Sequence, residues 1–66
     1  MSDELEKAKN DPRLPATTRL MAWCQLEGTF RAPKCDAVAH ELHIPRSTAG
    51  DAIHALVTCG VMHRAA

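Results

Sequence analysis

Three residues, His43, Ile44 and Pro45, separate two segments with a helical sequence pattern, and this short connection constrains the fold more than any other feature. A proline ring disfavours helical backbone at the preceding residue and supplies no backbone N–H, so a helix is expected to end before Ile44. Apolar residues on both sides of the connection recur three and four positions apart, as they do along one face of an amphipathic helix. The pattern therefore predicts two short helices joined by a tight turn.

A further helical pattern precedes these two, so the periodicity predicts three helices, over residues 18–27, 34–42 and 46–59. Thr17 suits the N-cap of the first helix, and Gly28 and Gly60 suit the ends of the first and third. The inner faces of the second and third helices are predicted to hold Cys35, Val38, Ala39, Leu42, Ala49, Ala52, Ile53 and Leu56. The expected fold class is all-α, with a three-helix helix-turn-helix core. Residues 61–64 add a short terminal β-strand at most, as a truncated wing.

The first sixteen residues differ in composition from the rest of the chain. Leu5 and Leu14 are their only sizeable apolar residues, and Pro12 and Pro15 interrupt them. A segment with so little apolar surface cannot compensate the entropy lost on ordering. We therefore expect residues 1–16 to form a flexible N-terminal arm, with a helical turn near residues 4–9, or an arm that orders on a partner. Residues 17–66 are expected to form the helix-turn-helix domain.

The composition disfavours several classes of protein. Eight basic side chains balance eight acidic ones, so no polybasic coat binds polyanions by charge alone. No apolar run approaches the roughly 18 residues of a membrane span, and the charged N-terminus does not resemble a secretory signal. The cysteines are odd in number, whereas small secreted domains carry an even disulfide framework. We expect a cytoplasmic protein with reduced thiols and, since no catalytic constellation occurs, no enzymatic activity.

The cysteines and histidines do not follow the spacing of a metal site. No Cys-x-x-Cys occurs; Cys35, His40 and His43 are close in sequence, but Cys35 is predicted to face the core and His40 to face away from it. Cys24 and Cys59, like Cys35, are expected to be small core residues. Neither a metal nor another cofactor is expected.

The residues around the turn resemble a known family; they are Val38-Ala39, Ile44-Pro45-Arg46-Ser47-Thr48-Ala49, Leu56 and Gly60-Val61. They are similar to the DNA-reading head of IclR-type winged helix-turn-helix transcription regulators, and the resemblance covers residues 17–64. It implies a recognition helix that begins near Arg46, with its first residues near the DNA. This chain has His43 where the family usually has glycine, and Gly50-Asp51 where members often carry a His-Arg pair.

The outward face of the third predicted helix is the candidate DNA-reading surface. Its small and polar side chains are compatible with entry into the major groove, where base edges are read. The helix residues expected to contact DNA are Arg46, Ser47, Thr48, Gly50, Asp51 and His54. Arg31, Lys34 and Arg64, together with Arg46, are candidates for phosphate contacts. The alternative interpretation is a solvated helix face that binds nothing.

These patterns predict a small sequence-specific DNA-binding transcriptional regulator that acts as a repressor. Trp23, Leu26 and residues 61–62 offer a further apolar surface, and association is a common way for a small domain to gain stability. We therefore expect a homodimer that binds double-stranded DNA, with no membrane partner and no small-molecule effector domain. The alternative is a winged-helix protein–protein interaction module, for example a phage or plasmid accessory protein that does not bind DNA. The zero net charge and Asp51 favour that alternative.

Overall fold

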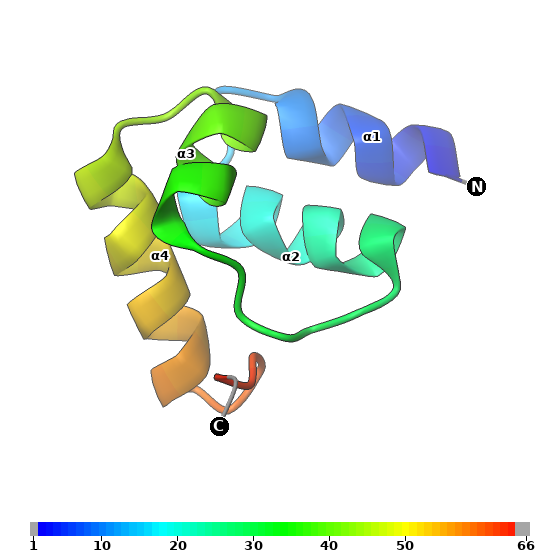
Figure 1. The fold of residues 1–66 in the computed structure, drawn as a ribbon. Helices are drawn as coiled ribbons and strands as arrows, with labels where there is room; N and C mark the ends of the chain where they lie inside the picture. Colours follow the sequence, from blue (N-terminus) through cyan, green and yellow to red (C-terminus); the bar gives the residue numbers. More distant parts are fainter. Residues whose placement is uncertain (1, 65–66) are drawn as a thin grey trace.

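The computed structural model describes residues 2–64, which form four α-helices and no β-strand (Figure 1). The helices are α1 (Ser2–Asn10), α2 (Ala16–Glu27), α3 (Cys35–Leu42) and α4 (Arg46–Thr58). The described part of the chain is therefore all-α, as the periodicity predicts. Met1 and residues 65–66, which belong to the predicted arm and domain, lie outside the described residues.

The three predicted helices correspond to α2, α3 and α4, and their ends differ from the prediction by two residues at most. The prediction that Thr17 is the N-cap of α2 is wrong. Pro15 occupies the N-cap, with φ −58° and ψ 148°, and its carbonyl accepts the first helical hydrogen bond from the Arg19 N–H at 3.1 Å. Thr17 therefore lies inside the first turn of α2, where it cannot cap the helix.

Gly28 and Gly60 follow α2 and α4 in the left-handed backbone region, at φ 75° and φ 80°. At the end of α2, the Gly28 and Thr29 N–H groups donate to the carbonyls of Gln25 (3.2 Å) and Cys24 (3.1 Å). Residues 60 and 61 make the equivalent bonds after α4, to the carbonyls of residues 57 and 56. This pairing is the Schellman motif, which satisfies carbonyls left open at a helix end. Both glycines therefore stop their helices as predicted.

His43 takes the same left-handed conformation at the end of α3, with φ 55° and ψ 48°. The backbone N–H groups of His43 and Ile44 both point to the carbonyl of Ala39. A side chain with a Cβ is uncommon in this conformation and strains it. The turn between α3 and α4 is therefore built on a strained residue.

Replacing His43 is expected to change stability according to how well the new residue tolerates the left-handed region. His43→Gly should raise the free energy of unfolding by up to about 1 kcal/mol, because glycine avoids the Cβ clash while its freedom in the unfolded chain offsets part of the gain. His43→Val should lower it by about 1–2 kcal/mol, because a β-branched residue is a stronger outlier there. Urea unfolding of the three chains measures both changes. Equal effects of the two substitutions would contradict the strain.

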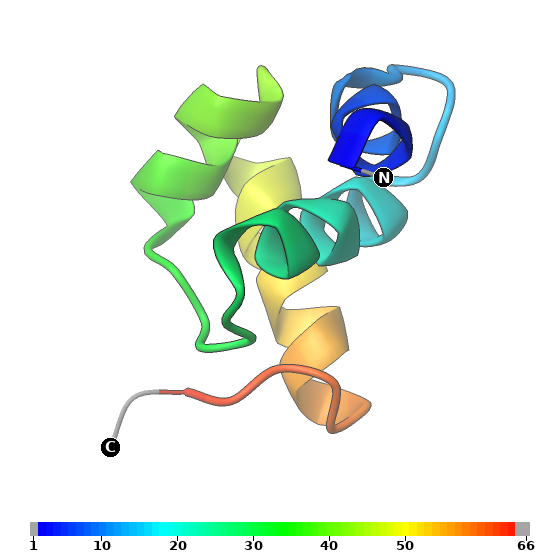
Figure 2. The same ribbon diagram turned by 90° about the vertical axis from the view of Figure 1, so that its right-hand side faces the viewer.

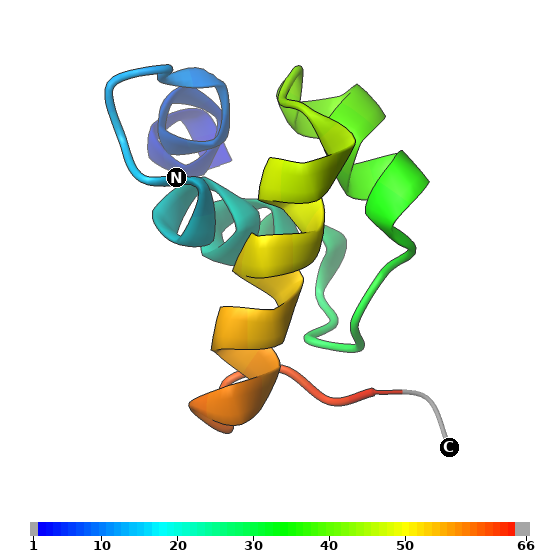
Figure 3. The same ribbon diagram turned by 90° about the vertical axis from the view of Figure 1, so that its left-hand side faces the viewer.

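The hydrophobic core lies between α2, α3 and α4, and its buried members are Leu20, Cys24, Val38, Leu42, Ala49, Ala52, Ile53, Leu56 and Met62. Every residue predicted for the inner face of α4 is buried there, and so are Val38 and Leu42 of α3. Cys35 and Ala39 are half-buried and pack against the core, and Ile44 packs on it from the turn. Figures 1 and 3 show α4 crossing α2, so that one side of α4 meets the rest of the fold.

Where the sequence predicts a mobile arm with a helical turn, the structure has the nine-residue helix α1 packed against α2 (Figures 1 and 2). Its charges suit a helix, since Asp3 and Glu4 lie in the first turn and Lys7 and Lys9 in the last. Composition alone indicates disorder because α1 has little apolar surface to bury. Its contacts with the other helices include two polar ones, a hydrogen bond from Arg19 of α2 and an ion pair with Glu41 of α3.

The C-terminal segment also differs from the expectation of an unpaired strand. His63 donates its N–H to the Phe30 carbonyl at 2.9 Å, and its own carbonyl accepts from the Ala32 N–H at 2.6 Å. The result is a single parallel bridge between Arg31 and His63, which is too short to be a strand. Met62, only 2% exposed, fixes this segment to the core. Within residues 2–64 no helix is long and apolar enough to cross a membrane.

Candidate nucleic-acid interface

The side of α4 that faces the viewer in Figure 3 is not covered by another helix. Ser47, Asp51, His54 and Thr58 are exposed. Their spacing of four, three and four residues aligns them in one stripe along a helix. The buried residues of α4 lie on the opposite side, which packs on the core. The stripe, here called the α4 stripe, offers hydroxyl, carboxylate and imidazole groups to solvent.

Two of the helix residues expected to contact DNA lie beside the α4 stripe. Gly50 is half-buried, and a Cβ added to it would lie 3.5 Å from the Sγ atom of Cys35. Gly50 therefore faces α3, where an added Cβ would make ordinary van der Waals contact. Thr48 is also half-buried, and at 100° per residue it lies on the other flank of the stripe. Of the predicted reading residues, Ser47, Asp51 and His54 share the open face.

Arg46, the first residue of α4, forms an ion pair with Asp36 in the first turn of α3. Its Nε atom lies 2.8 Å from Oδ1 of Asp36, and the two side chains are 74% and 73% exposed. An ion pair this exposed contributes little stability, about 0–1 kcal/mol. The guanidinium is therefore free to exchange its carboxylate partner for another anion at small cost. The sequence pattern did not predict this pair.

Two of the remaining basic candidates, Arg31 and Arg64, lie near the other end of α4. The bridge between Arg31 and His63 brings Arg31 close to Arg64 in the following position. Both arginines are exposed, and so is Lys34, which occupies the N-cap of α3. Because α4 has 13 residues, a helix of its length spans about 20 Å. The basic side chains thus flank the α4 stripe rather than forming one patch.

Arg19 is the polar residue that sequence reasoning missed. It is buried, at 6% exposure, and its Nε atom donates to the Lys9 carbonyl at 2.8 Å. Its Nη2 atom donates to the Leu42 carbonyl at 2.5 Å. One guanidinium thus binds the C-terminal ends of α1 and α3, where carbonyls are open and the helix dipole is negative. An arginine in the first turn of a helix gives no sequence signal for such a role.

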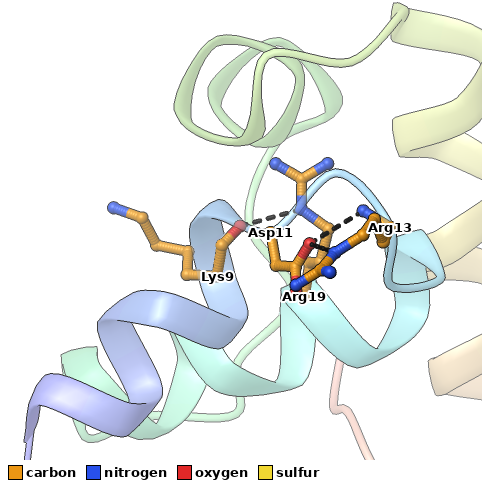
Figure 4. A network of polar contacts seen from close by, with 4 residues as sticks. All are labelled: Lys9, Asp11, Arg13 and Arg19. Atoms are coloured by element: carbon orange, nitrogen blue, oxygen red, sulfur yellow. Dashed lines mark hydrogen bonds and ion pairs between the residues drawn. The ribbon is translucent and has the colours of Figure 1, made fainter.

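Around Arg19 the N-terminal segment carries two further ion pairs. Arg13 donates from Nε to Asp11 Oδ1 at 3.0 Å and from Nη2 to Oδ2 at 3.1 Å (Figure 4). These side-chain bonds, with a backbone bond from the Arg13 N–H, lower the pKa of Asp11. Lys9 Nζ lies 2.9 Å from Glu41 Oε1, and this hydrogen bond lowers the pKa of Glu41. The second pair connects α1 to α3.

The three cysteines are unpaired and differ in environment. Cys24 is buried, and its burial, together with the charge of Glu27, raises the pKa of its thiol. Cys35 is half-buried, but Cys59 is exposed, so the prediction of Cys59 as a core residue is wrong. Cys59 caps the C-terminus of α4, just beyond the last buried turn. Among residues 2–64 no three His, Cys, Asp or Glu side chains come close enough to hold a metal.

Trp23 packs against the core but remains half-buried, because two shallow hollows border it. The first, about 250 Å³, is lined by Trp23, Cys24, Glu27, Thr29, Arg31 and Pro33. The second, about 260 Å³, lies between α1, α2 and α3 and is lined by Glu6, Lys9, Trp23, Leu26, Glu27 and Glu41. The indole therefore contributes to the core and to the surface at once.

Comparisons with protein-family models, curated proteins and solved structures find no match to this chain.

Proposed function

We propose that this protein is a small sequence-specific DNA-binding regulator of transcription that acts as a repressor. The observation that carries the proposal is the open polar α4 stripe on a helix that follows α3 after a three-residue turn. In this interpretation α2, α3 and α4 form a helix-turn-helix core. The major groove, about 12 Å wide, admits one α-helix, and such a helix enters with its N-terminal residues nearest the bases.

The side chains of the α4 stripe support base reading. A serine hydroxyl such as that of Ser47 bonds to donors or acceptors on several base edges, and a carboxylate such as Asp51 accepts from the amino group of cytosine. His54 adds a ring that both donates and accepts. None of these three side chains has a partner among the hydrogen bonds that involve side chains of residues 2–64. Their polar atoms are therefore available to a ligand.

The flanking cations support phosphate binding. Arg46 lies at one end of the α4 stripe and Arg31 and Arg64 lie near the other, while Lys34 precedes α3 next to Cys35, which faces Gly50. Cations on both sides of a groove-bound helix bind the two phosphate backbones and fix its position, while the bases supply specificity. Because the protein has a net charge of zero, its DNA affinity depends on these few side chains. The protein is proposed to act in the cytoplasm.

A second candidate function is a protein–protein interaction module on the same scaffold. Asp51 lies on the α4 stripe and Asp36 binds Arg46, and both carboxylates repel phosphates. A partner with basic side chains would suit these positions better than DNA does. The two functions differ in how binding responds to salt and to the loss of the Arg46 side chain.

Arg46→Ala is expected to weaken binding to duplex DNA by about 1–3 kcal/mol if the guanidinium contacts a base, with relaxed specificity at that position. If it contacts only phosphate, affinity should fall for all sequences and the slope of log affinity against log salt should shrink by about one. Titration of mixed duplex DNA at low and higher salt measures both. Arg13→Ala, which removes an exposed arginine bound to Asp11, serves as the matched control and should leave affinity unchanged.

Two carboxylate variants sharpen this test. Asp36→Asn removes the partner of Arg46 and should tighten DNA binding, since it frees the guanidinium and removes a negative charge. Asp51→Ala should leave nonspecific DNA binding unchanged or tighter, because it also removes a negative charge. If Arg46→Ala leaves DNA affinity unchanged but abolishes binding to a protein partner, the interaction module replaces the regulator.

The proposed regulator acts as a homodimer on paired half-sites, as helix-turn-helix proteins do. Val61 is the large apolar residue that residues 2–64 leave exposed, at 38%, and it lies beside the bridge of the C-terminal segment. Val61→Glu is expected to convert a dimer into a monomer in sedimentation equilibrium, because a buried unpaired charge opposes association. His40→Glu, on the exposed face of α3, is the control and should remain dimeric. Monomeric wild-type protein at high concentration would contradict the dimer.

A further inference from the structure

Helix α1 lies outside the hydrophobic core. The buried core residues come from α2, α3, α4 and the C-terminal segment, and so do the half-buried apolar residues that pack against them. Residues 3–10 of α1 contain no buried side chain, and Leu5, Ala8 and Lys9 are half-buried. The folding of α2–α4 therefore does not depend on apolar surface from α1.

Two polar contacts hold the C-terminal end of α1 to the rest of the fold. The carbonyl of Lys9 accepts the hydrogen bond from Arg19 Nε at 2.8 Å, and the Lys9 ammonium binds Glu41 at 2.9 Å. The side chains of Lys9 and Glu41 are 13% and 38% exposed, so the carboxylate end of this ion pair is open to water, which weakens the pair. A hollow of about 260 Å³ lies between α1, α2 and α3, so part of the surface between α1 and the other helices is open to solvent.

Separation of α1 would leave few buried groups without a partner. The Lys9 carbonyl and the Arg19 Nε group would face water, which replaces both halves of their bond. The second Arg19 bond, to the Leu42 carbonyl, joins α2 to α3 and does not involve α1. The cost of detaching α1 is therefore smaller than the cost of opening the core, and local openings of this kind occur below the free energy of global unfolding.

We infer that α1 is a strap that docks on, and detaches from, a folded α2–α4 body. In the docked state it covers Arg19 and one side of the hollow that Trp23 and Leu26 line. In the detached state that surface and one edge of the guanidinium are open to solvent, while the α4 stripe keeps its arrangement. The strap is independent of the proposed DNA binding, because α4 and α1 make no shared side-chain contact among the described hydrogen bonds and ion pairs.

Native-state hydrogen exchange on the full chain tests the strap, with NMR following the amides of residues 6–10 and those of the core helices. The α1 amides are expected to exchange at least about tenfold faster than the most protected amides of α2 and α4. Lys9→Met should raise the exchange rate of the α1 amides by about two- to fivefold and leave the exchange rate of the core amides unchanged. Lys7→Met is the matched control, since Lys7 is exposed on the same helix. It should change the exchange rate of neither the α1 amides nor the core amides.

Three results would overturn the strap: α1 amides as protected as those of the core, a change in Lys9→Met that is shared by all helices, and an α1 exchange rate in Lys9→Met that matches that of Lys7→Met. Because Lys9→Met removes one part-buried ion pair and no residue of the hydrophobic core, the variant is expected to fold. The outcome does not depend on whether the protein binds DNA.

Discussion

Arg19→Met is expected to lower the free energy of unfolding by about 3 kcal/mol, the sum of two hydrogen bonds from a charged donor at about 1.5 kcal/mol each. Methionine fills similar space but donates to neither the Lys9 nor the Leu42 carbonyl, and the second of these bonds is buried. A domain of 66 residues has a total stability of about 3–10 kcal/mol. The variant should therefore lose about a third or more of its stability, as a lower midpoint in a urea titration followed by circular dichroism would show.

The guanidinium fork itself is tested by Arg19→Lys. An ammonium keeps the charge but is a compact donor that does not match two separated carbonyls, so the loss should be intermediate. Arg13→Met is the control, because Arg13 is 88% exposed and binds only the neighbouring Asp11; it should change stability by less than about 0.5 kcal/mol. Equal losses in the Arg19 and Arg13 variants would contradict the role of Arg19.

Leu42→Ala is expected to cost about 2–5 kcal/mol, because the side chain is completely buried and its removal leaves a cavity. Leu42 is the last residue of α3, and its carbonyl binds Arg19. The cavity would therefore lie next to the turn that orients α4. We expect thermal unfolding to lose its cooperativity, or the midpoint of urea unfolding to fall by a large amount.

Leu26→Ala makes the same chemical change at a half-buried position on α2 and serves as its control. Its expected cost is about 1 kcal/mol, in proportion to the smaller apolar area that it removes from water. If both leucines gave the same loss, Leu42 would not be the fully buried core residue that the structure shows. The two variants together separate burial in the core from apolar surface beside the α1 hollow.

The parts of the fold that the sequence predicts are those governed by local rules. The inner face of α4 follows from the 3.6-residue period, and Ala49, Ala52, Ile53 and Leu56 are all buried. The ends of α2 and α4 follow from glycine, which alone adopts the left-handed region without strain. The polar residues Ser47, Asp51 and His54 share the open face for the same periodic reason. Their role in reading DNA stays a prediction, because periodicity places a residue on a face without naming its ligand.

The parts that the sequence does not predict depend on contacts between distant residues. Gly50 belongs to the small polar set of α4, but the approach of Cys35 from α3 turns it into a packing residue. Cys59 follows the apolar pattern, but the core ends one turn earlier. The C-terminal segment, which lacks a second strand in sequence, pairs with residues 30–32 across the loop before α3.

The sequence by itself determined the all-α class, the three core helices and the tight turn, because helix propensity, proline and glycine act within a few residues. The tertiary structure alone decided that the polar N-terminal segment is a helix and where it lies. That segment has too little apolar surface to specify its own position. Its place depends on one guanidinium, Arg19, which binds carbonyls 10 residues before it and 23 residues after it. No local pattern encodes a contact that exists only once three helices have come together.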